Sequence, residues 1–468
     1  LPAFASSRDL RVLAHRVMKD RAPFIIIGGG VAGLAAAAEL GDEAITLERE
    51  KRPGGLVRTD YVDGYWFDHV LHLLHFQDPT IERRIRALIG ADLAPLNTEA
   101  FVETDRGVAR FPIQLHLAGL DPDTAAACLA GLVRAANDTD SSRPANYEDM
   151  LLRSFGRELC ELFFFPYNRK QWKRPLDTLA PSGFQWNIAR PDLESATHGA
   201  MDPEHRALAY NANAWYPRPL QHGVRGMEVL SRALAGEASD LRLEHTVSAI
   251  DPDARHVLAT HDGREYELHY DDACIATLPL PVLMSITEGV PADLREACSR
   301  LLCNRVVNAM IRVRGPRPQH RGFWRYYADE SLCFTRLIHL HEFDPDTAPR
   351  GGWGLMAEMM EPAEWPAPDL ASAETVIRRD LARAGAIPEG CEILGIDFKV
   401  IDTAYVVFTL DCQSVVERAV AHLRARGVHP LGRYGRWEYS SMAQAIRDGF
   451  GLASSLQEPD ARDGRLQA

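Results

Sequence analysis

The feature that most constrains this chain is a glycine-rich turn near its beginning. Apolar residues 24–27 predict a buried parallel strand, Gly28-Gly29-Gly30-Val31-Ala32-Gly33 follows at once, and residues 34–40 predict a helix. The order of strand, Gly-x-Gly-x-x-Gly and helix is typical of a unit that binds a dinucleotide. Gly28 allows the tight turn, Gly30 lets the backbone approach a pyrophosphate, and Gly33 lets helix and strand pack closely. The N–H groups that begin the helix would face the anion.

The next segment favours FAD over NAD. A second strand, residues 44–47, ends at Glu48, about 20 residues after Gly28, where a carboxylate can accept hydrogen bonds from both ribose hydroxyls. The pair Gly54-Gly55 follows, and a glycine pair lets the chain turn beneath a cofactor without side-chain clashes. A simple NAD dehydrogenase does not need this second turn.

Composition excludes several classes of protein. The 468 residues suggest about three domains, and 46% apolar with 25% charged residues is the ordinary globular range. The net charge of −13 argues against nucleic acid as a partner. The eight cysteines form no Cys-x-x-Cys pair, which argues against a disulfide scaffold or zinc site and favours the reducing cytoplasm. The sequence contains no run of 18 apolar residues, so we predict no membrane span, and its first 21 residues do not resemble a signal peptide. We expect a cytoplasmic protein with a small-molecule substrate; its oligomeric state is unknown from the sequence.

Three histidines recur at a spacing of three: His69, His72 and His75. Because no carboxylate stands nearby and this spacing drifts around a helix, we predict no metal site. The simpler interpretation is a half-buried loop or strand.

An aromatic and basic block lies inside a predicted helical region, residues 121–179. Most of its rings should belong to the core. Tyr167, Arg169 and Trp172 follow Pro166 at a break, where a stacking surface and a cation could bind an anionic substrate.

Several segments resemble a known family. Residues 48–55 and Gly64-Tyr65-Trp66-Phe67-Asp68 are similar to the flavin-binding opening of the amine oxidase and protoporphyrinogen oxidase superfamily, and UDP-galactopyranose mutases belong to the same structural group. Residues 167–172 resemble the mutase signature Tyr-x-x-Lys-Gln-Trp. Residues 432–442 resemble the segment Gly-Arg-x-Gly-x-x-x-Tyr-x-x-Met of mutases and oxidases. In the loop over the flavin ring, Val70-Leu71 stands where relatives have small residues.

The resemblance assigns roles to residues of this chain. It implies FAD as cofactor, contacted by Gly28, Gly30, Gly33, Glu48, Gly55, Leu56, Val247, Thr277, Gly432, Arg433, Ser441 and Met442. It places the catalytic groups at His72, His75, Arg336 and Tyr439, and the substrate contacts at Gln114, Tyr167, Arg169, Trp172, Arg190 and Tyr327.

The expected fold class is α/β. A Rossmann-like doubly wound FAD domain, discontinuous over residues 22–105, 215–280 and 400–456, is interleaved with an α+β substrate domain. The substrate domain comprises a helical part, 106–214, and a sheet with helices, 281–399.

Two enzymatic activities compete in the sequence, and a third interpretation is non-enzymatic. The first is an FAD-dependent oxidoreductase that takes a hydride from a sugar-type substrate, nucleotide-linked or glycosidic. The second is a mutase-like isomerase in which reduced flavin N5 attacks the sugar. The third is a flavin-binding protein without catalysis. The sequence ranks them in that order.

Overall fold

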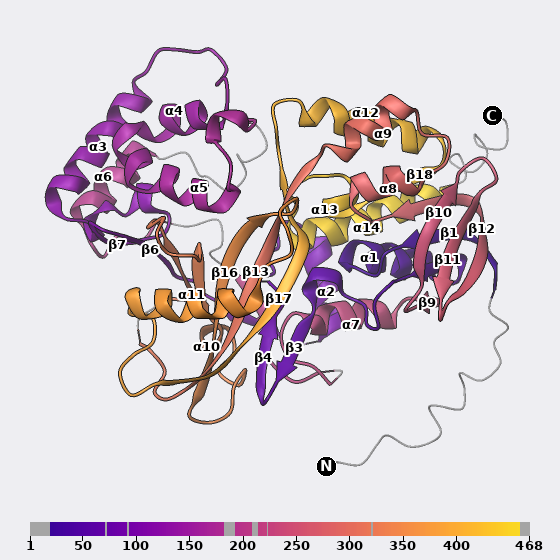
Figure 1. Ribbon diagram of the computed structural model, residues 1–468, viewed down its shortest axis with the longest axis horizontal. Coiled ribbons are helices and arrows are strands. Elements are labelled where there is room, and N and C mark those ends of the chain that lie inside the picture. The colour runs from indigo at the N-terminus through magenta and orange to yellow at the C-terminus, as the bar shows by residue number, and fades with distance from the viewer. Residues whose placement is uncertain are drawn as a thin grey trace.

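Two seven-stranded sheets organise the chain in a computed structural model, which describes residues 19–70, 73–90, 93–181, 192–207, 214–221, 223–319 and 322–458 (Figure 1). Two short antiparallel sheets of two strands accompany them: β3 (Thr59–Val62) with β4 (Tyr65–Asp68), and β5 (Leu93–Leu96) with β8 (Ala214–Pro217). The architecture is therefore mixed α/β, as the sequence predicts.

The first sheet has a parallel centre. Its strands run in the order β10-β11-β12-β1-β2-β9, with β18 also paired to β12, and their bounds are β1 (Arg21–Ile27), β2 (Ala44–Leu47), β9 (Leu241–Arg242), β10 (Thr246–Asp251), β11 (His256–His261), β12 (Arg264–Ala276) and β18 (Val428–Pro430). β1 pairs in parallel with β2 and β12, and β12 does so with β18. Phe24 and Ile26 face one apolar core and Ile25 and Ile27 the other, which is why this strand reads as a continuous apolar run.

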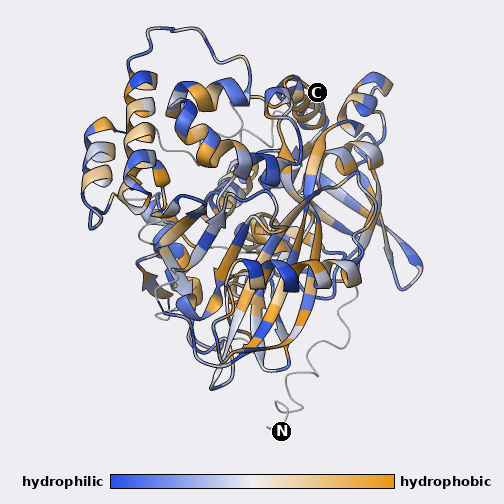
Figure 2. Ribbon diagram, turned by 60° about the vertical axis from the view of Figure 1, so that its left-hand side comes forward, coloured by the Kyte–Doolittle hydropathy of each residue, from blue (hydrophilic) through white to orange (hydrophobic). Residues whose placement is uncertain are grey.

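Helices cover both faces of this sheet. The face of Phe24 carries α1 (Val31–Leu40), α7 (Glu228–Gly236) and α14 (Met442–Gln457). The opposite face carries α8 (Leu280–Ile286), α9 (Ala292–Ser299) and α12 (Cys412–Ala425). The doubly wound arrangement is thus confirmed. Figure 2 shows apolar residues along the inner strands and polar residues on outward helix faces.

The second sheet is almost wholly antiparallel. Its order is β17-β13-β16-β15-β14-β6-β7, with bounds β6 (Ala100–Thr104), β7 (Gly107–Arg110), β13 (Leu302–Arg314), β14 (Trp324–Tyr327), β15 (Arg336–His339), β16 (Gly352–Pro362) and β17 (Glu392–Val407). α11 (Leu370–Arg383) packs on one face over a separate apolar core, and α10 (Leu340–Phe343) follows β15.

A helical lobe stands beside the second sheet, in purple in Figure 1. It consists of α3 (Pro122–Ala136), α4 (Tyr147–Leu159), a π-helical turn (Cys160–Phe164), α5 (Phe165–Trp172) and α6 (Leu193–Met201). Asp121 caps α3 by accepting the Thr124 N–H at 3.0 Å, directly before Pro122. The remaining helices are α2 (Pro79–Ile89) and the short α13 (Gly432–Gly435).

Three elements lie outside the units to which the sequence assigned them. β6, within 22–105, joins the second sheet by parallel pairing with β14. α8 and α9, within the range 280–299, pack beneath the first sheet. Parallel pairing of distant strands leaves no local turn signal, so neither placement is readable from sequence.

The first and last helices of the fold are in close contact. A Cβ on Gly449 in α14 would lie 2.5 Å from the Ala32 carbonyl oxygen and 2.9 Å from the Ala35 Cβ in α1. The packing distance between these helices therefore requires glycine at position 449, whereas Gly451 in the same helix is exposed with open space around it.

The pair Gly449 and Gly451 yields a test of this packing. Gly449→Ala should lower the free energy of unfolding by about 1–3 kcal/mol, because α14 must move from α1. Gly451→Ala should leave it unchanged or raise it by up to about 1 kcal/mol, because alanine favours the helix. Urea unfolding of both variants measures this, and equal effects would contradict the packing.

Candidate active site

The glycine loop leaves room for an anion at one position only. Gly28 has φ +108° and donates its N–H to Leu47 O at 2.8 Å, and a Cβ on Gly33 would lie 2.1 Å from Gly28 O. A Cβ on Gly30 would meet nothing within 4 Å. The first and third glycines are thus required by the fold, while the second borders open space at the N-terminus of α1, where a pyrophosphate fits.

A second glycine turn docks onto this loop. Gly54 (φ +118°) donates its N–H to Gly29 O at 2.7 Å, and a Cβ on Gly55 would lie 3.3 Å from Gly30 Cα. Glu48 is buried and accepts the Gly29 N–H at 2.6 Å through Oε2. The carboxylate therefore holds the loop as well as standing where a ribose would lie.

The end of the chain reaches the same place. Leu431 donates its N–H to Ala276 O at 2.9 Å, and Thr277 donates through Oγ1 to Ile27 O at 3.1 Å. A Cβ on Gly432 (φ +73°) would lie 3.0 Å from Ala32 Cβ. Distant segments thus meet where the parallel strands end.

The other expected cofactor contacts occupy varied positions. Ser441 caps α14 by accepting the Gln444 N–H at 3.1 Å, and Met442 is buried. Leu56 packs beside Val70, and Val247 lies half-buried in β10. The Arg433 side chain has a buried Nε for which no described residue provides an acceptor. This orphaned donor, together with the open space at Gly30, fits an anionic cofactor held between the two ends of the chain.

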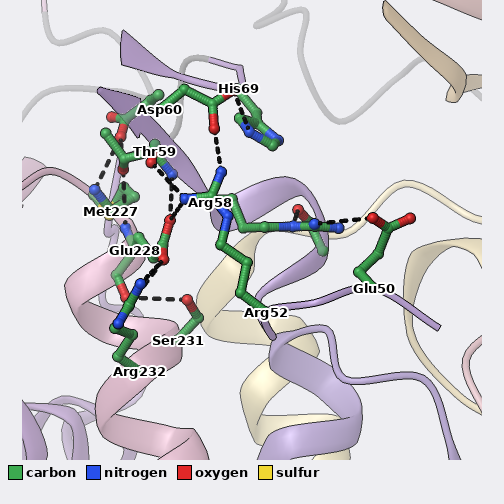
Figure 3. A network of polar contacts seen from close by, with 12 residues as sticks. Glu50, Arg52, Arg58, Thr59, Asp60, His69, Met227, Glu228, Ser231 and Arg232 are labelled. Atoms are coloured by element: carbon green, nitrogen blue, oxygen red, sulfur yellow. Dashed lines mark hydrogen bonds and ion pairs between the residues drawn. The ribbon is translucent and has the colours of Figure 1, made fainter. Parts of the chain in front are cut away.

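A buried carboxylate anchors the second glycine turn to α7 (Figure 3). Glu228 is fully buried and accepts from Arg52 Nη1 at 3.0 Å, the Thr59 N–H at 2.8 Å and Arg232 Nε at 2.9 Å. Arg52 also binds Asp60. Since every charge in this network is paired, the network holds the turn without an uncompensated buried ion.

His69 connects the same network to the loop that the sequence places over the flavin. Its Nε2 lies 3.0 Å from Asp60 Oδ2, and its carbonyl accepts from Asn308 Nδ2 at 2.6 Å. The described residues contain no cluster of three or more ligands able to hold a metal. His72 lies outside the described residues.

Asp68 is a second buried acid, in the motif that resembles the flavin-binding opening. It accepts from Thr59 Oγ1 at 2.5 Å, Tyr216 OH at 2.7 Å and the Met227 N–H at 3.0 Å. Burial raises the pKa of Asp68 from 3.8 to about 6, against the hydrogen bonds, and nearby Glu228 adds to the rise.

The pKa of Asp68 predicts a pH effect on stability. Because the folded chain holds the proton more tightly than the unfolded chain, this group stabilises the fold below about pH 4, and the contribution is lost as pH rises through about 6. Between these values wild type should lose about 2–3 kcal/mol more unfolding free energy than Asp68→Asn. Exposed Asp105→Asn is the control. Parallel stability curves for wild type and Asp68→Asn would contradict the prediction.

The open space at Gly30 predicts separable effects on binding and folding. Gly30→Ala should keep the stability of the cofactor-free chain and weaken FAD binding at least 10-fold, because its methyl group enters the anion space. Gly33→Ala should destabilise the cofactor-free fold itself, since its methyl would meet Gly28 O. Flavin fluorescence titration and urea unfolding measure the two effects. An unchanged FAD affinity in Gly30→Ala would contradict this placement.

A group of buried and half-buried aromatic and charged side chains lies between the lobe, the second sheet and the C-terminal segment. We call it the tyrosine cluster: Tyr167, Trp172, Tyr326, Arg336, Glu358, Tyr405, Arg433 and Tyr439. Tyr167 meets Tyr326 edge-on at 5.5 Å between ring centroids, and the guanidinium carbon of Arg433 lies 4.6 Å from the Tyr439 ring centre.

One ion pair lies inside this cluster. Arg336 donates from Nε and Nη2 to Glu358 Oε2 at 2.9 and 2.7 Å, and Tyr405 OH lies 3.4 Å from Glu358 Oε1. Glu358 is therefore engaged on both oxygens.

The tyrosine hydroxyls remain protonated. Burial is the main cause that raises the pKa of Tyr167 and Tyr439 well above the usual value, and it also raises the pKa of Tyr326 and Tyr405. Tyr439 OH already donates to Val406 O at 2.6 Å, and Tyr405 OH donates to Glu358. The hydroxyls of Tyr167 and Tyr326 can therefore serve as hydrogen-bond donors to an anion.

The structure separates the catalytic and substrate-binding residues expected from the sequence. Tyr167, Trp172, Arg336 and Tyr439 come together in the tyrosine cluster, whereas Arg190 lies outside the described residues.

Three further expected residues lie elsewhere. Arg169 is exposed and lies 3.8 Å from Glu330, because its position on α5 faces away from the cluster. Tyr327 points to the other face of the second sheet, where its ring packs on Phe334, since side chains alternate along a strand. Gln114 is buried in the turn Ile113–Leu115.

His75 is half-buried, and burial lowers the pKa of its imidazole, which is therefore uncharged at neutral pH.

Neither Glu358 nor Tyr405 was expected in the site from the sequence, and the substrate contact was assigned to Tyr327 instead of Tyr326. A carboxylate within the apolar run Leu355-Met356-Ala357-Glu358-Met359-Met360 is a signal that could have been used. Tyr405 carries no such signal.

Comparison with known proteins identifies the class. Residues 31–390 match the family described as flavin containing amine oxidoreductase. The chain therefore belongs to that family, and it is an FAD-dependent enzyme.

Relatives come from two branches. The chain is 26% identical to "Probable UDP-galactopyranose mutase" of Klebsiella pneumoniae over 166 residues, 32% of this chain and 40% of the relative. It is 25% identical to Polyamine oxidase 2 of Arabidopsis thaliana over 347 residues, 69% of this chain and 66% of the relative. The chain thus spans less than two thirds of either relative.

Solved structures share the fold along most of the chain. A reduced UDP-galactopyranose mutase superposes with TM-score 0.83 at 22% identity, covering 93% of both chains. A putative protoporphyrinogen oxidase from Exiguobacterium superposes with TM-score 0.68 at 16% identity, covering 93% and 98%.

The sequence predicts no membrane span and argues against a disulfide scaffold, and the described residues bear on both points. None of their helices is long and apolar enough to cross a membrane. All eight cysteines are free thiols.

Proposed function

We propose that this enzyme rearranges a sugar that is attached to a diphosphate, without net oxidation of the sugar. The observation that carries this proposal is the tyrosine cluster, in which four protonated hydroxyls lie with Arg433 and the Arg336–Glu358 pair.

The cluster is suited to an anionic leaving group. Hydroxyl donors and a guanidinium stabilise the negative charge that develops on a departing diphosphate, and they do so best where water is excluded. Trp172 is buried and its ring contacts those of Tyr405 and Tyr439; its Nε1 donates to Asn168 Oδ1 at 3.1 Å, which holds the ring in place beside the cluster.

The same cluster is poorly suited to removing a proton from a sugar hydroxyl. Among the described residues of the cluster Glu358 is the single carboxylate, and Arg336 and Tyr405 engage both its oxygens. Bound FAD would supply a nucleophilic nitrogen when reduced or a hydride acceptor when oxidised. The hydrogen-bond donors of the tyrosine cluster favour a sugar with an anionic leaving group, which is the kind of substrate that reduced FAD would attack.

The relatives support an anionic substrate over a cationic one. One relative is described as a UDP-galactopyranose mutase, whose substrate carries a diphosphate, whereas polyamines are cations that Arg433 would repel.

A second candidate is the oxidoreductase that the sequence ranks first. The uncharged imidazole of His75 favours it, because a neutral histidine beside the flavin could take the proton from an alcohol as its hydride leaves.

One experiment distinguishes the two. The purified holoenzyme is incubated anaerobically with UDP-galactopyranose and other nucleotide sugars, with and without dithionite. The mutase proposal expects product of the same mass only after reduction, and no bleaching of oxidised flavin by substrate. Bleaching by the sugar supports the oxidoreductase, and neither effect with any nucleotide sugar contradicts both.

A single hydroxyl tests the tyrosine cluster itself. Tyr167→Phe should lower kcat by about 10-fold to 100-fold with unchanged FAD content, because one donor to the anion is lost. Tyr61→Phe, in an exposed ring, is the matched control. An unchanged kcat in Tyr167→Phe would place the reacting phosphate elsewhere.

A further inference from the structure

The second sheet has a long open edge. β17 is the outermost strand of that sheet and pairs with β13 alone. Near its end, the carbonyls of Ala404 and Val406 accept hydrogen bonds from Tyr434 and Tyr439, at 3.2 and 2.6 Å. Over residues 392–401, no described residue pairs with the outer backbone groups of β17.

An edge of this kind is a template for another strand. Unpaired N–H and C=O groups in a row can bond to a further β-strand, and proteins block unwanted pairing with short edge strands, proline or bulges. The stretch from Gly395 to Ile401 contains no proline, and it pairs with Val306 to Arg312 of β13 without a register shift; a shift follows between Gly395 and Ile393. The strand is therefore open over a length sufficient for a continuous ladder.

The two faces of the open stretch differ in chemistry. Ile396, Phe398 and Val400 are half-buried and pack toward the core beneath α11. Asp397 and Lys399 occupy the other face, with side chains 38% and 31% exposed.

We propose that two copies of this chain associate along β17, antiparallel, with the two-fold axis at Phe398. In an antiparallel pair related by an axis through the sheet, directly opposite residues share a face. Centring on Phe398 places Asp397 opposite the partner's Lys399, and Lys399 opposite the partner's Asp397. It also places Ile396 opposite the partner's Val400, beside the two Phe398 rings.

The charges select this register. Centring on Asp397 or Lys399 would place two like charges directly opposite each other at the axis, which is destabilising. Centring on Ile396 would place Lys399 opposite the partner's Ile393. Of these four registers, the one at Phe398 alone forms two opposite-charge pairs.

The existing ion pairs are compatible with this arrangement. Lys399 Nζ lies 3.5 Å from Asp60 Oδ2, and Asp397 Oδ2 lies 3.1 Å from Arg312 Nη2. In the dimer, positive and negative side chains alternate along the two paired β17 strands. Lys399 can therefore keep its contact with Asp60, and Asp397 its contact with Arg312. The joint would continue the network of Figure 3, to which Asp60 belongs.

Charge reversal and exchange test the register. The full-length holoenzyme, 52.1 kDa as a monomer, should sediment at twice that mass at micromolar concentration. Asp397→Lys and Lys399→Asp alone should each raise the dimer Kd about 10-fold or more, since two attractive pairs become repulsive. The exchanged double variant, Asp397→Lys with Lys399→Asp, restores opposite charges and should recover the dimer, although its ion pairs with Asp60 and Arg312 are lost.

A cross-link provides a readout independent of those charges. Phe398→Cys places the two thiols next to the axis and should form a dimer on oxidation that thiol reagents reverse. Cys303, Cys333 and Cys391 are partly exposed, so wild type under the same oxidation is the control for any cross-link that they form. A monomeric wild type, single variants that dimerise like wild type, or a dimer that Phe398→Cys does not cross-link would each overturn the proposal.

Discussion

The structure depends on the contact between two glycine turns, where the Gly54 N–H donates to Gly29 O at 2.7 Å. At this distance the second turn has no room for side chains: a Cβ on Gly55 would lie 3.3 Å from Gly30 Cα, and one on Gly54 would lie 2.6 Å from Ser231 Oγ. The contact aligns the N-terminus of α1, the carboxylate of Glu48 and the start of the β3–β4 hairpin. Because all three meet at the end of parallel strands, one anionic ligand can bind them together.

Buried charge keeps that contact in place. Glu228 and Asp68 are both withdrawn from water, and each is held by at least three donors from segments far apart in sequence. A buried carboxylate with fewer donors would be costly, so the hairpin and α7 are fixed to one another. His69 and Asn308 extend this restraint to the second sheet, and the cofactor and substrate regions share one rigid boundary.

On the substrate side, burial determines the chemistry of ordinary tyrosines. Hydroxyls withdrawn from water keep their protons and become donors, while Arg336 is held by Glu358 rather than left to approach a ligand freely. A site of this composition is suited to the anionic substrate that we propose. It is compatible with the net charge of −13, because Arg336 and Arg433 are half-buried and lie in one cluster.

Local signals in the sequence were sufficient for the cofactor domain. The apolar run 24–27, the spacing from Gly28 to Gly33, Glu48 and the Gly54-Gly55 pair all act over short distances, because turns and strand ends are determined by neighbouring residues. They establish an α/β fold with a dinucleotide site. The resemblance at residues 432–442 predicts that the end of the chain contacts the same cofactor, and the packing of α14 on α1 agrees with this prediction.

The tertiary structure alone decided the substrate side. Tyr326 and Tyr327 lie on opposite faces of β14, so only Tyr326 belongs to the cluster. Tyr167 and Arg169 lie on different sides of α5, so Tyr167 joins the cluster and Arg169 lies beside Glu330. Glu358 and Tyr405 join the cluster from strands whose pairing has no local signature. Sequence alone thus determined an α/β fold with a flavin dinucleotide as cofactor, and its glycine turns as the predicted place of binding. Which side chains form the tyrosine cluster was decided by long-range strand pairing, because burial and partners set the charge and direction of each group only after distant segments have met.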